Sequence, residues 1–304
     1  MRVLVTGAAG YVGYAVGRRL IAGGHEVLGL VRRPGQIHAL PDGVIPVVAD
    51  LLDPGALRAA LPAPLDGVCH LAALTRVRES FRDPLRFFTV NVQGTVNLLE
   101  ALPGGVRLVH GSTAAVYGAP ERQPIRESEP PSPTNAYGAS KLAAEQAIRF
   151  HCAAHSLGAT ILRTFNVAGS VDGRGDPDPT RLIPRALRAA AGRIPRVEVN
   201  GDGAAVREFV HVDDLAGAYV LALEAVRPGE PRVYNVGTGH GSSVREVLDM
   251  VEEVTGRPVP RVRRPPQPEP PELVADCTAV RADLGWRPSR SGLREIVTDA
   301  WSCL

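Results

Sequence analysis

Apolar and polar residues follow two regular patterns along the chain. Short apolar runs predict buried β-strands, and the longer stretches between them have the spacing of amphipathic helices. Because strands that alternate with helices form parallel sheets covered on both faces, the pattern predicts a doubly wound α/β fold. The predicted strands are Met1–Thr6, His25–Val31, Ile45–Ala49, Gly67–Leu71, Val106–His110 and Thr160–Arg163, and the predicted helices are Tyr11–Ala22, Pro54–Leu61, Phe87–Leu102, Ala136–His155 and Arg181–Ala191.

The alternation weakens after the sixth strand. Residues 169–180 have the composition of a loop, and residues 261–271 are rich in proline and predict irregular structure. The proline-rich piece suits either a linker or a loop folded over a site. We therefore expect one domain over residues 1–165 and a smaller lobe over residues 166–304, with segments near 206–235 returning to the first domain.

A glycine-rich turn follows the first strand and opens the first helix. Gly7, Gly10 and Gly13 stand in the spacing G-x-x-G-x-x-G. In such a turn the first glycine permits the tight bend, the second lets the backbone approach a pyrophosphate, and the third lets helix pack on strand. The unpaired N–H groups of the helix start suit phosphate oxygens. The first domain is thus predicted to be a Rossmann-type, dinucleotide-binding domain.

The second predicted strand ends without the acidic residue that would bind an adenosine ribose 2′-hydroxyl. The chain has Val31, Arg32 and Arg33 at this point. Two guanidinium groups suit a 2′-phosphate, which favours NADP over NAD. The alternative is that Arg32 and Arg33 only begin a solvated loop before Pro34.

Composition narrows the class of protein. The 304 residues are 44% hydrophobic, which is ample for a core, and the formal net charge of +2 is too small to indicate a nucleic-acid or membrane partner. No apolar run reaches the length of a membrane span, and Arg2 with the following glycines does not fit a signal peptide. The four cysteines are far apart and predict neither a zinc site nor disulfides. We expect a cytoplasmic enzyme without a metal.

A tyrosine and a lysine stand four residues apart in a predicted helix. Tyr137 and Lys141 belong to N-A-Y-G-A-S-K, and Thr113 lies upstream in G-S-T-A-A-V-Y-G. Residues four apart share a helix face, so the ammonium can reach toward the phenol and favour phenolate. A tyrosine base near neutral pH needs its pKa lowered by roughly 3 units, or about 4 kcal/mol. A solvated helix face is the plain alternative, but the glycine turn favours redox chemistry.

Several motifs together resemble those of a known family. The chain is identified as a member of the extended short-chain dehydrogenases/reductases, in the NAD-dependent epimerase/dehydratase family, and is most similar in pattern to UDP-glucose 4-epimerases. The motifs are T-G-A-A-G-Y-V-G at 6–13, V-A-D-L-L-D at 48–53, H-L-A-A at 70–73, N-V-Q-G-T at 91–95, S-T-A-A-V-Y-G at 112–118, Y-G-A-S-K at 137–141, L-R-T-F-N-V-A-G at 162–169, V-R-E-F-V-H-V-D-D-L-A at 206–216 and Y-N-V-G-T-G at 234–239.

The resemblance implies roles for individual residues. Thr113 would bind the reacting hydroxyl, Tyr137 would act as base and acid, and Lys141 would hold the nicotinamide ribose and lower the tyrosine pKa. The other implied contacts are Asp50 and Leu51 with the adenine, Ala72 and Ala73 with the cofactor, Asn91 with the nicotinamide side, and Asn166 and Arg207 with the sugar nucleotide.

Each of the polar residues in that set also has a structural alternative. Asp50 would cap a turn, Asn91 would cap its helix, and Asn166 would satisfy loop backbone. Arg207 would pair with Glu208 or Asp213. His211 is predicted to be structural rather than catalytic.

The chain departs from the family pattern at three further places. Ala114 and Ala115 follow Thr113 where dehydratases carry acidic residues, which disfavours 4,6-dehydration. Thr75 replaces a lysine that lies near the phosphates in typical galactose epimerases. The usual R-x-G-D appears as R-P-P-Q-P-E, so Arg264 and Glu269 are the candidates for those nucleotide contacts.

These observations leave three hypotheses. The first is a nucleotide-sugar 4-epimerase that works through a transient 4-keto sugar, with NAD or NADP as cofactor. The second is an NADPH-dependent nucleotide-sugar 4-ketoreductase, and the third is a catalytically silent dinucleotide sensor or scaffold. The resemblance also implies a homodimer that forms through residues 92–102 and Ala136–His155.

Overall fold

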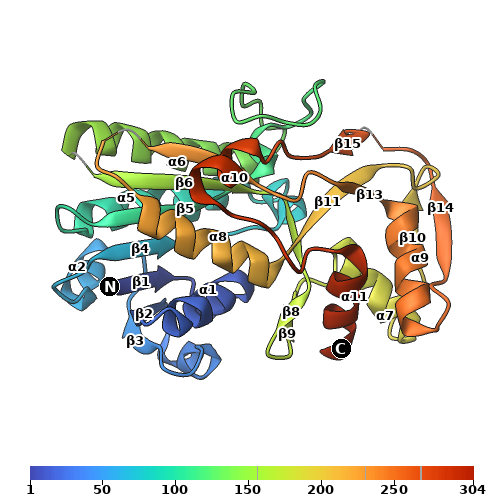
Figure 1. Cartoon of the computed structure of the whole chain (residues 1–304), viewed down its shortest axis with the longest axis horizontal. Coiled ribbons are helices and arrows are strands. Elements are labelled where there is room, and N and C mark those ends of the chain that lie inside the picture. Colours follow the sequence, from blue (N-terminus) through green and yellow to red (C-terminus); the bar gives the residue numbers. More distant parts are fainter. Residues whose placement is uncertain (156, 230, 268) are drawn as a thin grey trace.

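The computed structural model describes residues 1–155, 157–229, 231–267 and 269–304. Its largest element is a seven-stranded sheet in which every neighbouring pair is parallel, with the order β12-β6-β5-β4-β1-β2-β3 (Figure 1). This is the strand order of a dinucleotide-binding doubly wound fold, which is the fold class that the sequence predicted. The strands are β1 (Arg2–Thr6), β2 (Glu26–Val31), β3 (Ile45–Val48), β4 (Gly67–His70), β5 (Arg107–Thr113), β6 (Gly158–Thr164) and β12 (Arg232–Val236).

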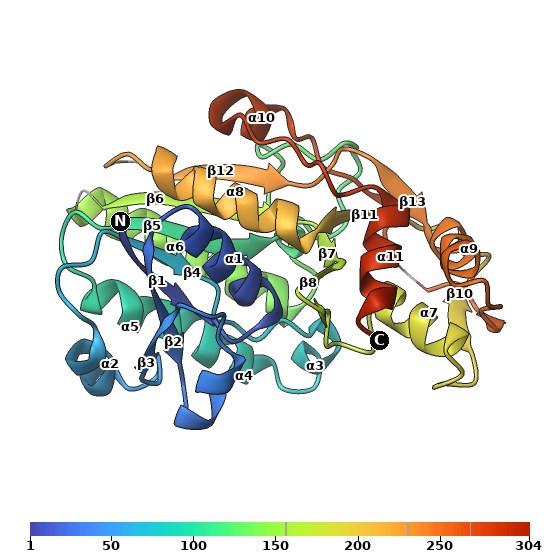
Figure 2. The ribbon, with the colours of Figure 1, turned by 60° about the horizontal axis from the view of Figure 1, so that its bottom comes forward.

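Helices cover both faces of this sheet (Figure 2). Since alternate side chains of a strand point to opposite faces, Val3 and Val5 join one core cluster and Leu4 joins the other. Helices α1 (Tyr11–Ala22) and α8 (Val212–Ala225) pack on the first face. Helices α2 (Pro54–Ala60), α5 (Gly94–Ala101) and α6 (Ala136–His155) pack on the second.

A second lobe lies at the carboxyl ends of the strands and has its own core. Its helices are α7 (Leu182–Ala190), α9 (Val244–Thr255) and α11 (Leu293–Ser302). Strand β10 (Val197–Asn200) pairs in parallel with β14 (Arg261–Arg264), and β11 (Val206–His211) pairs with β7 (Asn166–Ala168), β13 (Gly241–Ser243) and β15 (Glu272–Leu273). The shorter helices α3 (Val77–Ser80), α4 (Pro84–Phe88) and α10 (Thr278–Leu284) pack on the first lobe instead.

Two predicted elements were wrong in detail. The segment Phe87–Leu102 is not one α-helix, because a π-helical turn at Thr89–Gln93 separates α4 from α5. Part of the segment predicted to be irregular, Arg261–Arg264, forms β14 because it extends along β10. Pro268, in the proline-rich piece, lies outside the described residues.

The loop over residues 169–180 forms a small hairpin that ties the two lobes together. Its strands are β8 (Ser170–Val171) and β9 (Arg174–Gly175). The Tyr11 hydroxyl of α1 donates to the Gly169 carbonyl at 2.7 Å, and Arg174 donates to the Ala39 carbonyl at 2.5 Å. The start of α1 is therefore held directly against the second lobe.

His211 also joins elements. Its buried ring lies 3.0 Å from the Asp299 carboxylate of α11 and accepts from the Asp213 N–H at the start of α8. These contacts fit the structural role predicted for it.

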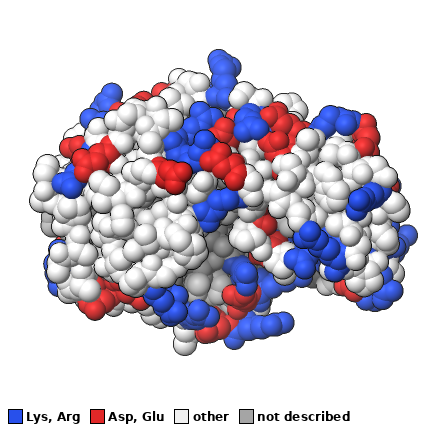
Figure 3. All heavy atoms as spheres, turned by 90° about the horizontal axis from the view of Figure 1, so that it is seen from below, with Lys and Arg blue, Asp and Glu red and all other residues white. Residues whose placement is uncertain are grey.

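Charged side chains of both signs are mixed over the face shown in Figure 3, with basic ones frequent over the second lobe on the right. No helix in the described part of the chain is both long and apolar enough to cross a membrane.

Candidate active site

The candidate site lies where β1, β4 and β5 end, next to the second lobe. Carboxyl ends of parallel strands meet at one edge of a sheet, which is where doubly wound folds bind their ligands. This edge brings together the glycine turn after β1, the loop that begins at Leu71 after β4, and Thr113 at the end of β5.

The glycine turn has the geometry of a phosphate cradle. Gly7 has a φ of +70°, and a Cβ there would come within 2.9 Å of the Ala72 N–H nitrogen. A Cβ on Gly13 would overlap the Gly7 carbonyl oxygen, so α1 packs against the turn only because this residue is glycine. Gly10 begins α1 without a side-chain cap, which leaves the first N–H groups of the helix available to phosphate oxygens. These residues fit a dinucleotide pyrophosphate.

Hydrogen bonds between buried side chains hold the neighbouring loop in place. The Thr6 hydroxyl accepts from the N–H groups of Leu71 and Ala72 at 3.0 and 3.1 Å, and His70 lies between Thr6 and Thr95. Ala72 and Ala73 follow in this loop and adopt no regular structure. The backbone beside the glycine turn is thus fixed from below.

Asn91 ties that loop to α6. Its amide oxygen accepts from the Leu74 N–H at 2.8 Å, and its amide nitrogen donates to the Leu74 carbonyl and to the Ser140 hydroxyl. Asn91 lies in the π-helical turn and is buried. The cap predicted as its structural alternative is not what it makes.

Thr113 lies at the end of β5, and its hydroxyl lies beside the Tyr137 phenol in the first turn of α6. Lys141 lies one turn further along α6. Burial raises the pKa of Tyr137, while the Thr113 hydroxyl and the Arg181 guanidinium lower it. The ring of Phe87 packs edge-on against Tyr137, with 6.4 Å between ring centroids. The phenol is therefore held beside the Thr113 hydroxyl, as the site requires.

Lys141 differs from the simple expectation that its ammonium keeps Tyr137 ionised. Its side chain is buried, and burial lowers its pKa to about 8, although the Glu145 carboxylate raises it. Because burial raises the pKa of Tyr137, the amine loses its proton before the phenol does as pH rises. Without a bound ligand, Lys141 is therefore an ammonium and Tyr137 a neutral phenol at pH 7. Ionisation of Tyr137 needs further positive charge nearby.

A buried ion pair lies beneath the site. Arg163 and Glu145 pair at 2.7 Å, and Glu145 also accepts from the Ser112 hydroxyl at 2.5 Å. The same guanidinium donates to the Tyr117 hydroxyl at 3.0 Å. These groups connect β5, α6 and β6, so they fix the backbone that presents Thr113.

Arg181 is a site residue that the sequence did not indicate. It is the N-cap residue of α7, and it pairs with Asp176 at 3.0 Å and with Asp178 at 3.9 Å. Asp178 in turn lies 3.7 Å from Arg76, which follows Thr75 in the loop after β4. This chain of charges bridges the two lobes next to Tyr137. Its only signal in the sequence was the charged loop D-P-D-P-T-R, whose folding back on the first domain could not be inferred.

Four residues predicted to contact the sugar nucleotide lie in the second lobe and are occupied by other protein groups. The Asn166 amide donates to the Glu208 carbonyl at 2.9 Å, which is the backbone role given as its alternative. Arg207 pairs with Glu269 at 2.9 Å, so its predicted alternative partners, Glu208 and Asp213, were wrong. Arg264 pairs with Glu198 at 2.5 Å. Thr75, in contrast, is exposed in the loop after β4.

The adenosine side of the candidate cofactor site is more open. The side chains of Arg32 and Arg33 are exposed, and their backbone N–H groups donate to the Gln36 amide oxygen. The Asp50 carboxylate accepts from the Leu52 N–H at 3.0 Å, which is the turn cap given as its alternative. Leu51 is held by a hydrogen bond from Asn97 to its carbonyl.

Comparison with known proteins places this site in a family. Residues 3–237 match the model of the NAD dependent epimerase/dehydratase family. A UDP-glucose 4-epimerase from Streptomyces lividans is 45% identical over 314 residues, which cover 99% of this chain and 95% of that protein.

Solved structures of epimerase-family proteins are also similar to this chain. The UDP-glucose 4-epimerase from Brucella ovis in complex with NAD superposes with a TM-score of 0.92 at 35% identity, covering 99% of this chain and 97% of the other. MoeE5 in complex with UDP-glucuronic acid and NAD gives a TM-score of 0.87 at 33% identity, covering 99% and 98%. The chain therefore belongs to the NAD dependent epimerase/dehydratase family, as its motifs predicted.

Proposed function

We propose that this protein is a nucleotide-sugar 4-epimerase that works through a transient 4-keto sugar. The observation that carries the proposal is the pairing of Thr113 with Tyr137 at the sheet edge that also bears the uncapped glycine turn. The 45% identity to a UDP-glucose 4-epimerase over nearly the whole chain supports the same reaction. The four-residue spacing of Tyr137 and Lys141 alone would not distinguish a catalytic pair from two side chains on a solvated helix face.

The side chains of the site then divide the work of proton transfer. The Thr113 hydroxyl forms a hydrogen bond with the reacting sugar hydroxyl and holds it near the Tyr137 phenol. Tyr137 removes the proton from that hydroxyl and returns it after the sugar has turned over. The pKa of Tyr137 must fall for this role, and Arg181 and Thr113 already act in that direction.

The glycine turn, Ala72, Ala73, Asn91 and Lys141 would hold a nicotinamide dinucleotide. The chemistry that such a cofactor would supply is reversible hydride transfer at the sugar carbon. An epimerase regenerates its cofactor in every cycle, which suits NAD, the cofactor in the Brucella ovis complex. Asp50 and Leu51 would lie at its adenine.

The second lobe would grip the nucleotide and leave the hexose free to turn. Arg207 and Arg264 supply guanidinium groups that can fork onto diphosphate oxygens. Asn166 and Thr75 lie on the two sides of the site, in β7 and in the loop after β4. The keto sugar can rotate in the site only if the diphosphate is bound firmly and the sugar loosely.

A direct experiment tests the reaction. Purified protein is incubated with UDP-glucose without added nicotinamide, and the products are separated by chromatography. We expect interconversion with UDP-galactose and retention of cofactor by the protein. Absence of interconversion with UDP-glucose, UDP-glucuronate, their N-acetyl analogues and dTDP-sugars would overturn the proposal.

A second function is favoured by one specific observation, the exposed pair Arg32 and Arg33 at the end of β2. Guanidinium groups there suit the 2′-phosphate of NADPH, and a net reductase draws on that cofactor. A 4-ketoreductase would oxidise NADPH in a 1:1 ratio with a 4-keto nucleotide sugar. The same purified protein, assayed by NADPH absorbance with such a substrate, distinguishes the two reactions.

We also infer a homodimer through α5 and α6. Apolar side chains on and beside α6 face solvent in the single chain: Phe150 is 75% exposed, and Phe81 and Leu85, in or near α4, are 67% and 75% exposed. Helix α4 packs on α6. Large exposed apolar side chains near one helix favour burial against a second copy.

A further inference from the structure

Two glutamates occupy the guanidinium groups that the proposed function assigns to the substrate diphosphate. The first is Glu269, whose carboxylate lies 2.9 Å from Arg207 and accepts from the Asn200 amide at 3.2 Å. Arg207 itself is mostly buried, with 17% of its side chain exposed. Glu269 is therefore the acidic partner of a guanidinium that has little access to solvent.

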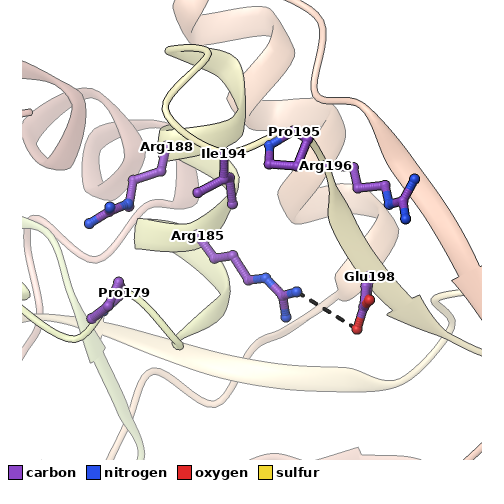
Figure 4. A pocket seen from close by; sticks show the side chains of 7 residues that line it. All are labelled: Pro179, Arg185, Arg188, Ile194, Pro195, Arg196 and Glu198. Carbon is purple, nitrogen blue, oxygen red and sulfur yellow. Dashed lines mark ion pairs between the residues drawn. The ribbon is translucent and has the colours of Figure 1, made fainter.

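The second glutamate is Glu198 on β10. Its carboxylate lies 2.5 Å from Arg264 and 3.9 Å from Arg185, so it stands between two cations. Figure 4 shows Arg185 pointing across a pocket toward Glu198, while Arg188 and Arg196 extend to other sides of it. The pocket has a volume of about 390 Å³.

The two pairs belong to one cluster. Residues two apart in a strand point to the same side, so Glu198 and Asn200 share the exposed face of β10, opposite the buried Val197 and Val199. The parallel register places Asn200 next to Arg264. Asn200 thus links the Glu269–Arg207 pair to the Glu198–Arg264 pair.

A carboxylate and a phosphate compete for the same guanidinium. The planar carboxylate and the tetrahedral phosphate can each accept two parallel N–H hydrogen bonds from arginine. One pair of guanidinium N–H groups can bind only one of them at a time. A diphosphate that reaches Arg207 and Arg264 must displace both carboxylates and then lies near their negative charge. The carboxylates oppose the ligand by occupying its donors and by repulsion.

We propose that Glu269 and Glu198 are competitors of the substrate, which hold Arg207 and Arg264 in their binding positions and are exchanged for the diphosphate when a nucleotide sugar binds. The proposal rests on the proposed function, because that function assigns the two arginines to a diphosphate. It gives Glu269 the opposite effect from the substrate contact expected from the sequence. A contact residue strengthens binding, whereas a competitor weakens it.

The test is the affinity for UDP, measured by calorimetry on the full-length protein and on Glu269→Gln, Glu198→Gln and the double variant. Glutamine keeps the shape and removes the charge. We expect each single variant to bind UDP about three- to tenfold more tightly than wild type and the double variant to bind more tightly still. Uridine, which has no phosphate, should bind all four proteins equally.

Glu253→Gln is the matched control, because Glu253 forms an exposed pair with Arg294 in the second lobe but is not part of the cluster. Its affinity for UDP should equal that of wild type. Weaker UDP binding by Glu269→Gln and Glu198→Gln would overturn the proposal and make them substrate contacts, and unchanged binding would overturn it as well. Turnover of UDP-glucose by wild type, measured separately, tests the proposed function. If wild type turns over UDP-glucose but the variants bind UDP no more tightly, only the proposed exchange of carboxylates for diphosphate is wrong. Absence of UDP binding by all the proteins defeats both.

Discussion

Burial sets the protonation states of the central residues before any ligand binds. It raises the pKa of Tyr137 and lowers that of Lys141 to about 8. Both shifts disfavour the charged form, which is the effect of desolvation. The buried ammonium of Lys141 therefore destabilises the fold at neutral pH.

Replacing that lysine should stabilise the protein. Lys141→Met keeps most of the unbranched side chain and removes the buried charge, which is worth about 3 kcal/mol at pH 7. The unfolded lysine keeps its proton up to pH 10.5, whereas the folded one loses it near pH 8. Wild-type stability therefore rises between these values, and the advantage of the variant disappears above them. Urea unfolding at pH 7 and pH 10 measures this. A variant less stable than wild type at pH 7 would mean that electrostatic attraction between Lys141 and Glu145 outweighs desolvation.

Arg181 should influence the pH dependence of turnover. Its guanidinium lowers the pKa of Tyr137, so Arg181→Gln raises that pKa and moves the rise of kcat to higher pH. We expect kcat at pH 7 to fall about 3- to 10-fold. Arg181→Lys keeps the charge and is the control. A pH profile of Arg181→Gln with reduced height but unchanged midpoint would contradict an electrostatic role.

The sequence identified some of these residues and not others for a physical reason. Thr113, Tyr137 and Lys141 lie in local motifs, and the spacing of Tyr137 and Lys141 within one helix already predicted a shared face. Arg181 and the partners of Arg207 depend on contacts between segments far apart in the chain, which no local pattern records. The roles of the predicted site residues stay predictions until they are tested by substitution.

At the scale of elements, the glycine turn is tightly constrained. Gly13 has no room for a side chain, since its Cβ would overlap the Gly7 carbonyl. The sequence predicted this turn and the two elements it joins, because the requirement for glycine is local. It did not predict the break between α4 and α5, where a π-helical turn buries Asn91. That break depends on the contact of Asn91 with the loop after β4.

Gly13→Ala should separate α1 from the turn. We expect a loss of about 2–4 kcal/mol in the free energy of unfolding and a loss of cofactor retention. Gly217 in α8 is the matched control, because a Cβ there meets no atom within 4 Å. Gly217→Ala should stabilise the protein by about 0.5–1 kcal/mol, the gain in helix propensity. Urea unfolding of both variants measures the contrast, and equal stabilities would contradict the packing described for Gly13.

At the scale of the whole molecule, the site is assembled by two lobes with separate cores. The parallel sheet and the helices on both faces followed from the alternating pattern, so the fold class of the first lobe was predictable, whereas the edge strand β12 was not predicted. The second lobe was less so, because strands such as β14 and β15 are short and acquire their structure only by pairing with β10 and β11. The sequence consequently located the site residues of the second lobe least well.

The proposed dimer predicts an effect of charge on the exposed face of α6. Phe150→Glu places a carboxylate where 75% of an aromatic side chain faces solvent in the single chain. We expect sedimentation to show a dimer for wild type and a monomer for the variant. Ile45→Glu is the control, because Ile45 is 45% exposed on the edge strand β3 at one end of the large sheet. A wild-type monomer, or a variant that remains dimeric, would contradict the inferred interface.

The central claim is that the Tyr137 hydroxyl carries the proton in a nucleotide-sugar epimerase. The most direct measurement is the rate of UDP-glucose interconversion by Tyr137→Phe beside its affinity for UDP. The account predicts a rate at least ~100-fold below that of wild type with affinity within about twofold, since only an acid/base group is removed. A variant that turns over at a near-normal rate would contradict the claim.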